Sequence, residues 1–113
     1  MTIAPLISAC AEQILPVIDL LDGKWTIHIL CAMCEHPVRL SELRRALPNA
    51  SKKSLTASLR SLEAAKIVVR RDLSNSLLHV EYELTESARE SLPTLLGTLV
   101  EWKNTHEDLF PSP

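Results

Sequence analysis

Apolar residues in the first third of the chain recur three and four positions apart, the spacing of a helix with one buried face. A first stripe predicts a helix over residues 14–21, ended by Asp22-Gly23 with the glycine in the left-handed conformation. The next run, Lys24 to Glu35, is apolar nearly all round, so we expect a central buried helix that His36-Pro37 stops.

Two further helices are predicted in the middle of the chain. The first covers Leu40 to Leu47 and is closed by Pro48. The second runs to about Ala65, with Ser51 as its candidate N-cap. Its buried stripe consists of leucines at helical spacing: Leu55, Leu59 and Leu62.

The residues after this helix change to the alternating pattern of β-strands. Ile67 to Asp72 and Val80 to Leu84 alternate, and Leu73 to Ser76 supply turn residues between them. We therefore expect a β-hairpin, with the side chains at 80, 82 and 84 on one face.

A last helix is predicted from Thr85 through Trp102, with Pro93 expected to kink it or to split off its first turns. Residues 110–113 are expected to be a frayed tail. The order of four helices, a hairpin and a helix is that of a winged helix-turn-helix. The predicted fold is mainly α with a small β-hairpin wing, in one domain covering residues 1–113.

Composition narrows the class of protein. Hydrophobic residues make up 46% of the 113 residues, which fits one domain with a modest core, and no apolar run approaches the roughly eighteen residues of a membrane helix. The first fifteen residues lack the positive charges of a signal peptide, and three cysteines do not suggest a secreted disulfide scaffold. We therefore expect a cytoplasmic protein with no membrane partner.

Positive charge is concentrated in one segment. Residues 39–71 carry nine of the twelve Lys and Arg residues and two of the fourteen carboxylates, a net charge of +7, while the remainder carries −9. Such an asymmetry lets a small domain meet a phosphate backbone on one face. The alternative is a pair of ordinary solvated helices. Because the segment coincides with the predicted helix, turn, helix and hairpin, we favour double-stranded DNA as the partner.

Five blocks of the sequence resemble the HxlR-type bacterial transcriptional regulators. In the family's order and spacing, across about residues 15–102, they are Leu20–Thr26, Leu40–Pro48, Ser51–Thr56, Leu59–Ala64 and Val80–Thr85. The resemblance implies a homodimer that binds operator DNA. We expect a repressor that occupies an imperfect palindrome near a promoter, without enzymatic activity or a cofactor. A winged-helix module that binds another protein is the main alternative, and a thiol redox protein is a second.

The helix that begins near Ser51 is the candidate recognition helix. With about 100° per residue, its leucines face inward, and Lys66 follows on the same side with its amine reaching outward. The opposite face carries two alanines beside two cations, a low surface that lets a helix enter a major groove. This face consists of Lys53, Ala57, Arg60 and Ala64.

Each polar residue of this helix has an expected role. We assign Lys53 and Arg60 to base edges or phosphates and Lys52 to a phosphate. Thr56 flanks the face, and Ser51 lies at the N-terminus, where backbone N–H groups favour phosphate. The alternative is that these cations are merely solvated.

The preceding helix and the wing supply the remaining DNA candidates. Arg44 and Arg45 lie late on a helix that crosses the DNA backbone in this motif, which fits positioning without base readout, although either could pair with Glu42 or Glu63. Family members often carry Pro-Pro-Arg before the second strand, and this chain has Leu-Leu-His there. Asn75 and His79 are therefore weak candidates for a wing contact.

The terminal helices are the predicted dimer interface. A trihelical core with a wing cannot cover both of their apolar stripes, and two recognition helices need a two-fold axis to reach successive major grooves. The interface candidates are Ile14, Val17, Ile18, Leu92, Leu95, Leu96, Leu99 and Trp102.

The cysteines suggest no zinc site. Several relatives have a redox-active Cys directly before the Pro-Val of the first matched helix, and this chain has Leu15 there. Cys31 and Cys34 lack a second Cys or His pair at metal spacing. Relatives have an apolar residue at the position of Cys34 and often a polar one at that of Cys31, so the resemblance implies that Cys34 is a small core residue and that Cys31 is accessible. Cys31 is therefore the candidate thiol sensor, with an unknown effector.

Overall fold

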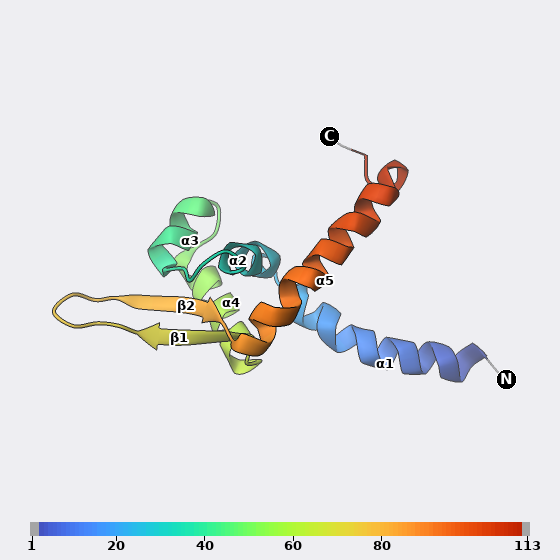
Figure 1. Cartoon of the computed structure of the whole chain (residues 1–113), viewed down its shortest axis with the longest axis horizontal. Coiled ribbons are helices and arrows are strands. Elements are labelled where there is room, and N and C mark those ends of the chain that lie inside the picture. Colours follow the sequence, from blue (N-terminus) through green and yellow to red (C-terminus); the bar gives the residue numbers. More distant parts are fainter. Residues whose placement is uncertain (1–2, 112–113) are drawn as a thin grey trace.

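The computed structural model describes residues 3–111 as six helices and a two-stranded hairpin (Figure 1). In chain order the elements are α1 (Ile3–Leu21), α2 (Thr26–Met33), α3 (Leu40–Ala46), α4 (Lys52–Ala64), β1 (Val68–Asp72), β2 (Val80–Leu84), α5 (Glu86–Thr105) and the short 3₁₀ helix η1 (Glu107–Leu109). This confirms the predicted fold class, a mainly helical winged helix-turn-helix with a hairpin wing.

One core joins α2, α3, α4, the hairpin and the start of α5. The three leucines of the α4 stripe are buried, as their spacing predicted, and so is the centre of α2. Burying a leucine or isoleucine side chain stabilises a fold by about 1.5–3 kcal/mol. The largest fully buried side chains are Ile29, Leu30, Leu43, Leu55, Leu59, Leu62, Val68 and Leu84.

The hairpin is antiparallel, with Arg70 opposite Tyr82 and Val68 opposite Leu84. Val38 forms an isolated β-bridge on the other side of β2, where it exchanges two backbone hydrogen bonds of 2.8 Å with Tyr82. The loop runs from Leu73 to His79 and is longer than the predicted four-residue turn, and it projects far from the body (Figure 1).

α4 ends in a motif that the sequence did not reveal. Lys66 has φ of 62°, the left-handed conformation usually taken by glycine, and the Ile67 N–H donates to the Leu62 carbonyl at 3.0 Å. The helical wheel therefore does not extend to Lys66, and its expected inward position is wrong. Conversely, the expected left-handed Gly23 is wrong, since no glycine in residues 3–111 has positive φ. A Cβ at Gly23 would instead collide with Thr26 Oγ1.

The terminal helices also differ from the prediction. α1 begins at Ile3 and includes Pro16, while α5 continues across Pro93 to Thr105, so Pro93 does not split off its first turns. Phe110 is not frayed, because its ring packs edge-on against Trp102 with centroids 5.8 Å apart. The last two residues of the predicted tail lie outside the described residues.

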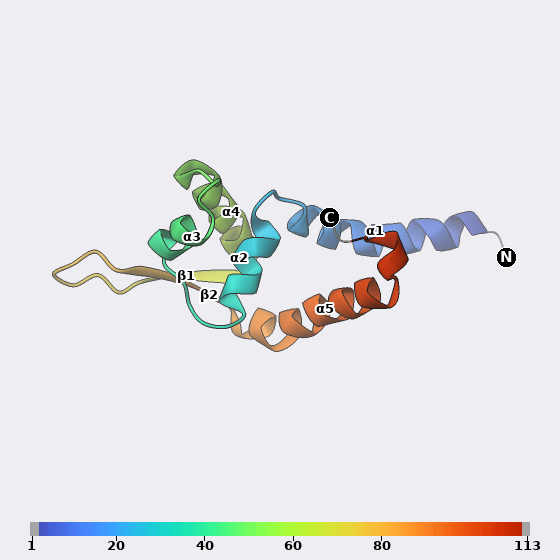
Figure 2. The same cartoon turned by 90° about the horizontal axis from the view of Figure 1, so that it is seen from above.

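α1 and α5 extend away from the body (Figure 2). The radius of gyration is 16.9 Å, against about 13 Å for a compact chain of this length. Both helices therefore carry surface that the rest of the chain does not cover. Among the residues that the structure describes, no helix is long and apolar enough to cross a membrane.

Candidate nucleic-acid interface

The outward face of α4 is a shallow basic depression, here called the α4 hollow. The leucine stripe fixes its orientation, since Leu55, Leu59 and Leu62 are at most 1% exposed and the opposite side chains point to solvent. The predicted placement of Lys53 and Arg60 on the exposed face is therefore confirmed, while their contact with DNA stays a prediction. The hollow is lined by Lys52, Lys53, Thr56, Ala57 and Arg60.

Ser51 has the capping role that its position predicted. Its Oγ accepts a 3.0 Å hydrogen bond from the Ser54 N–H and donates to Ser54 Oγ at 3.0 Å. The first N–H groups of a helix have no intrahelical acceptor, so those of Lys52 and Lys53 remain directed out of the helix end. Ser51 thus caps the N-terminus of α4, and the free backbone N–H groups beside it are positioned to bind an anion.

A second depression, the α3 hollow, lies along α3 and the loop that follows it. Arg44 and Arg45 are both exposed in the last turn of α3. Neither takes part in the ion pairs found within residues 3–111, which join Arg71 and Arg89 to Glu83 and His79 to Glu81. The α3 hollow is lined by Ser41, Arg44, Arg45, Pro48 and Ala50.

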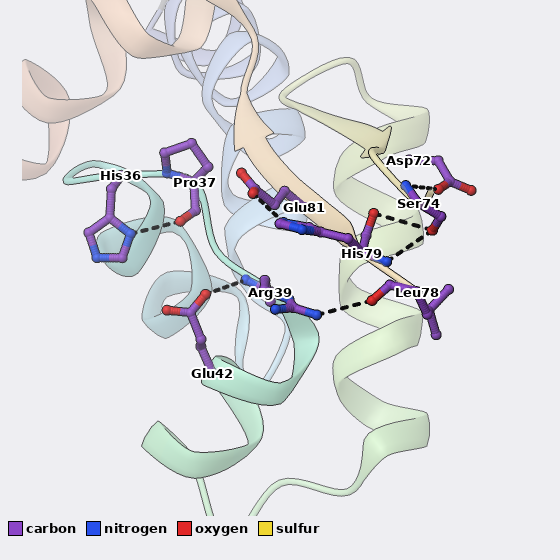
Figure 3. Close-up of polar contacts among 9 residues, drawn as sticks. All are labelled: His36, Pro37, Arg39, Glu42, Asp72, Ser74, Leu78, His79 and Glu81. Carbon is purple, nitrogen blue, oxygen red and sulfur yellow. Dashed lines mark hydrogen bonds and ion pairs between the residues drawn. The ribbon is translucent and has the colours of Figure 1, made fainter. Parts of the chain in front are cut away.

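Glu42 caps α3 instead of pairing with Arg44 or Arg45. Its carboxylate accepts a 2.9 Å hydrogen bond from the backbone N–H of Arg39 and so caps the start of α3 (Figure 3). A Glu in the first turn is favourable there because it also faces the positive end of the helix dipole.

The wing tip presents apolar side chains and no free histidine. His79 Nε2 lies 2.6 Å from the Glu81 carboxylate (Figure 3). Asn75 is exposed, and its backbone N–H donates to the Leu77 carbonyl at 3.3 Å. Leu77 and Leu78 are each 80% exposed. A DNA contact by Asn75 or His79 stays a prediction, with the His79 ring already engaged.

Hydrogen bonds nevertheless order the wing loop. The Asp72 carboxylate accepts from the Ser74 N–H at 2.9 Å, and Ser74 Oγ accepts from the His79 N–H at 2.9 Å (Figure 3). The bonds from Ser74 hold the pKa of Asp72 below its usual value, with a smaller effect from Arg70.

Two further cations, Arg39 and Arg70, were not singled out from the sequence. They line a third depression, the wing-base groove, between the start of α3 and the hairpin. The sequence did contain a signal for them, because both belong to the basic segment of residues 39–71. Arg70 also lies two residues after Val68, so the two side chains are on the same face of the strand. The groove is lined by Arg39, Leu40, Ser41, Arg70, Leu78, Val80 and Tyr82.

The apolar candidates on the terminal helices divide into two groups. Leu92 is 8% exposed and packs in the protein's own core, with Leu96 partly buried against it, so these two are internal rather than free for a partner. The other six, Ile14, Val17, Ile18, Leu95, Leu99 and Trp102, are 40–52% exposed, and the sequence analysis missed Leu15 and Val100 beside them.

The thiols differ in access as expected. Cys31 is exposed, whereas Cys34 is partly buried against the core. Burial raises the pKa of the Cys34 thiol, and the neighbouring Cys31 and Glu35 raise it further. We therefore expect Cys34 to be the less reactive of the pair.

Comparison with known proteins gives consistent matches. Residues 20–109 match the family model described as HxlR-like helix-turn-helix. The HTH-type transcriptional regulator YtcD of Bacillus subtilis (strain 168) is 39% identical over 89 residues, which cover 79% of this chain and 70% of YtcD.

Solved structures match over most of the chain. The redox regulator HypR in its reduced form superposes with a TM-score of 0.77 at 33% identity, covering 89% of this chain and 99% of HypR. The quinone-bound YodB of B. subtilis superposes with a TM-score of 0.71 at 26% identity, covering 83% and 98%.

Proposed function

The chain belongs to the HxlR-like helix-turn-helix family of transcriptional regulators, and from this premise we propose that it represses transcription as a homodimer bound to a palindromic operator. α4 enters the major groove and α3 crosses the DNA backbone. The observation that carries the proposal is the α4 hollow, where cations flank a small alanine opposite a fully buried leucine stripe.

Lys53 and Arg60 read the operator in this proposal. They lie on the exposed face of α4 with no carboxylate partner among the ion pairs of residues 3–111, so their charges are available to base edges or phosphates. Thr56 flanks them, and Lys52 holds a phosphate beside the helix N-terminus. Arg44 and Arg45 in the α3 hollow contact the backbone and set the register.

The homodimer forms through α1 and α5. Apolar side chains 40–52% exposed along two projecting helices are surface that a second copy can bury. A two-fold axis would set the two copies of α4 in successive major grooves, about 34–36 Å apart, which accounts for a palindromic operator. Occupying such a site near a promoter represses by excluding the transcription machinery.

The signal that relieves repression reaches Cys31 in this proposal. Cys31 is exposed on α2, whose buried side chains share one core with those of α3, α4 and β2, so an adduct there would tilt the DNA-binding elements. HypR is named as a redox regulator and YodB is bound to a quinone, which makes a thiol-reactive oxidant or quinone a reasonable class of effector for this chain. The sensing cysteine in this proposal differs from that of several relatives, because Leu15 occupies the position of their redox-active cysteine.

The test is binding to duplex DNA as a function of salt. An operator selected by the protein from a pool of random duplexes should bind with an affinity that falls steeply as salt rises, because phosphate contacts release counterions. A winged-helix module for protein partners would show no selected sequence and no such dependence.

A further inference from the structure

The wing-base groove continues the core face of the hairpin outward. Residues directly opposite in an antiparallel pair share a face, and so do alternate residues of one strand. Arg70 and Tyr82 therefore stand on the face that, nearer the body, carries the buried Val68 and Leu84. Beyond the core this face is open, so its apolar side chains form a floor and Arg70 stands beside it.

Two guanidinium groups line the groove, and neither has a carboxylate partner within residues 3–111. Arg39 donates one hydrogen bond of 3.2 Å to the Leu78 carbonyl (Figure 3), which leaves the other N–H groups of its guanidinium for an acceptor. Arg70 is exposed and takes part in none of the ion pairs of residues 3–111. The nearby carboxylates, Glu42 and Asp72, each accept from a backbone N–H at 2.9 Å.

On the opposite face of the hairpin the charged side chains form ion pairs. There Arg71 pairs with Glu83, and His79 pairs with Glu81. The wing tip, residues 73–78, adds no charged side chain. Unpaired positive charge on the wing is thus confined to its base, on the side that faces α3.

The remaining groups of the groove suit one kind of ligand. Ser41 and Tyr82 add hydroxyl donors to the two guanidinium groups, and these are the side chains that contact DNA phosphates, while the apolar floor suits a deoxyribose. Ser41 also lines the α3 hollow, so the groove adjoins the surface proposed to cross the DNA backbone.

The geometry points to a second backbone clamp: the wing-base groove holds a phosphate of the bound duplex between Arg39 and Arg70. The wing then grips DNA at its base, and its tip is not required. This inference rests on the proposed function and extends it to residues outside α3 and α4. Arg39 has a double role, since the same guanidinium also holds the wing loop in place.

The test compares two arginines of one strand that differ in face. Arg70→Ala should lower the slope of log affinity against log salt by about 0.9 per bound protomer, the value for one lost phosphate contact. Arg71→Ala removes the same charge from the opposite face and should leave the slope unchanged. Arg70→Lys keeps a cation and should retain most of the slope. Anisotropy titrations of the selected operator at several salt concentrations give all three values.

A neutral phosphate analogue locates the contact. One methylphosphonate at a time is placed along the operator. At one position per half-site it should weaken binding of the unmodified protein but not of Arg70→Ala.

Equal slope losses in Arg70→Ala and Arg71→Ala would show a diffuse electrostatic effect and overturn the clamp, as would no loss in either. If the clamp alone is wrong, Lys53→Ala still weakens operator binding. If the proposed function is wrong, the unmodified protein shows no salt-dependent affinity for duplex DNA.

Discussion

The guanidinium of Arg39 donates a 3.2 Å hydrogen bond to the carbonyl of Leu78, 39 residues later in the chain, and so fastens the wing loop to the start of α3. The backbone N–H of the same arginine is capped by Glu42. The helix-turn-helix and the wing are thereby held as one unit, because a single residue is bonded to both.

Loss of this bond should loosen the wing. Arg39→Ala is expected to lower the free energy of unfolding by about 0.5–1.5 kcal/mol, the net contribution of a typical hydrogen bond. Arg39→Lys retains a donor and should lose less. Chemical denaturation followed by circular dichroism measures both, and an Arg39→Ala protein as stable as the unmodified one would show that the bond contributes nothing in solution.

Lys66 should be a site where glycine stabilises the protein. Its φ of 62° lies in the left-handed region, which is unfavourable for a residue with a Cβ such as lysine and free of this cost for glycine. After allowing for the greater freedom of glycine in the unfolded chain, Lys66→Gly should raise the free energy of unfolding by about 0.5–1 kcal/mol. Lys66→Ala removes the charge but keeps the Cβ, so it should give no gain. Equal effects of the two substitutions would refute the backbone explanation.

The dimer should depend on Leu99. This side chain is 51% exposed in the single chain, so Leu99→Asp should leave the fold intact but dissociate the dimer and abolish operator binding. Leu73 on the wing is also 51% exposed, and Leu73→Asp is the matched control for dimerisation. Sedimentation equilibrium at micromolar protein decides, and a monomer already in the unmodified protein would contradict the proposed interface.

The two thiols of α2 should react in a fixed order. Burial raises the pKa of Cys34, so less of it is thiolate at neutral pH, while Cys31 is exposed. In a Cys10→Ser background, a limiting alkylating reagent should modify Cys31 first, and the share of Cys34 should grow as pH rises. Peptide mapping by mass spectrometry reads the order. Earlier modification of Cys34, or an oxidant response that survives Cys31→Ser, would remove the sensor assignment.

Periodicity predicted those parts of the structure that local pattern controls. The leucine spacing of α4 gave its buried and exposed faces, and the alternation of Val80, Tyr82 and Leu84 gave the second strand. Each pattern repeats within one element, so no knowledge of distant contacts was needed. The candidate cations of the α4 hollow followed directly from the same wheel.

Features that depend on other elements escaped the prediction. An amphipathic stripe on α5 does not distinguish Leu92, which the chain's own core covers, from Leu99, which it leaves exposed. Lys66 adopts a left-handed conformation without being a glycine, so its residue type did not indicate this conformation. The hydrogen bond from Arg39 to Leu78 joins segments far apart in sequence, which a local pattern does not report. The wing-base groove was missed for the same reason, since it exists only where α3 meets the hairpin.

The central claim, that the exposed face of α4 reads an operator, is tested most directly by anisotropy titrations of the selected operator and of a scrambled duplex. Lys53→Ala and Arg60→Ala should each weaken operator binding by about 1–3 kcal/mol where the side chain reads a base, and should affect the scrambled duplex less. Arg44→Ala should weaken both duplexes alike and lower the salt slope by about one unit. Lys24→Ala, between α1 and α2, removes one exposed charge outside the proposed DNA and dimer contacts and should change neither. Unchanged operator affinity in both Lys53→Ala and Arg60→Ala would contradict the assignment of α4 as the recognition helix.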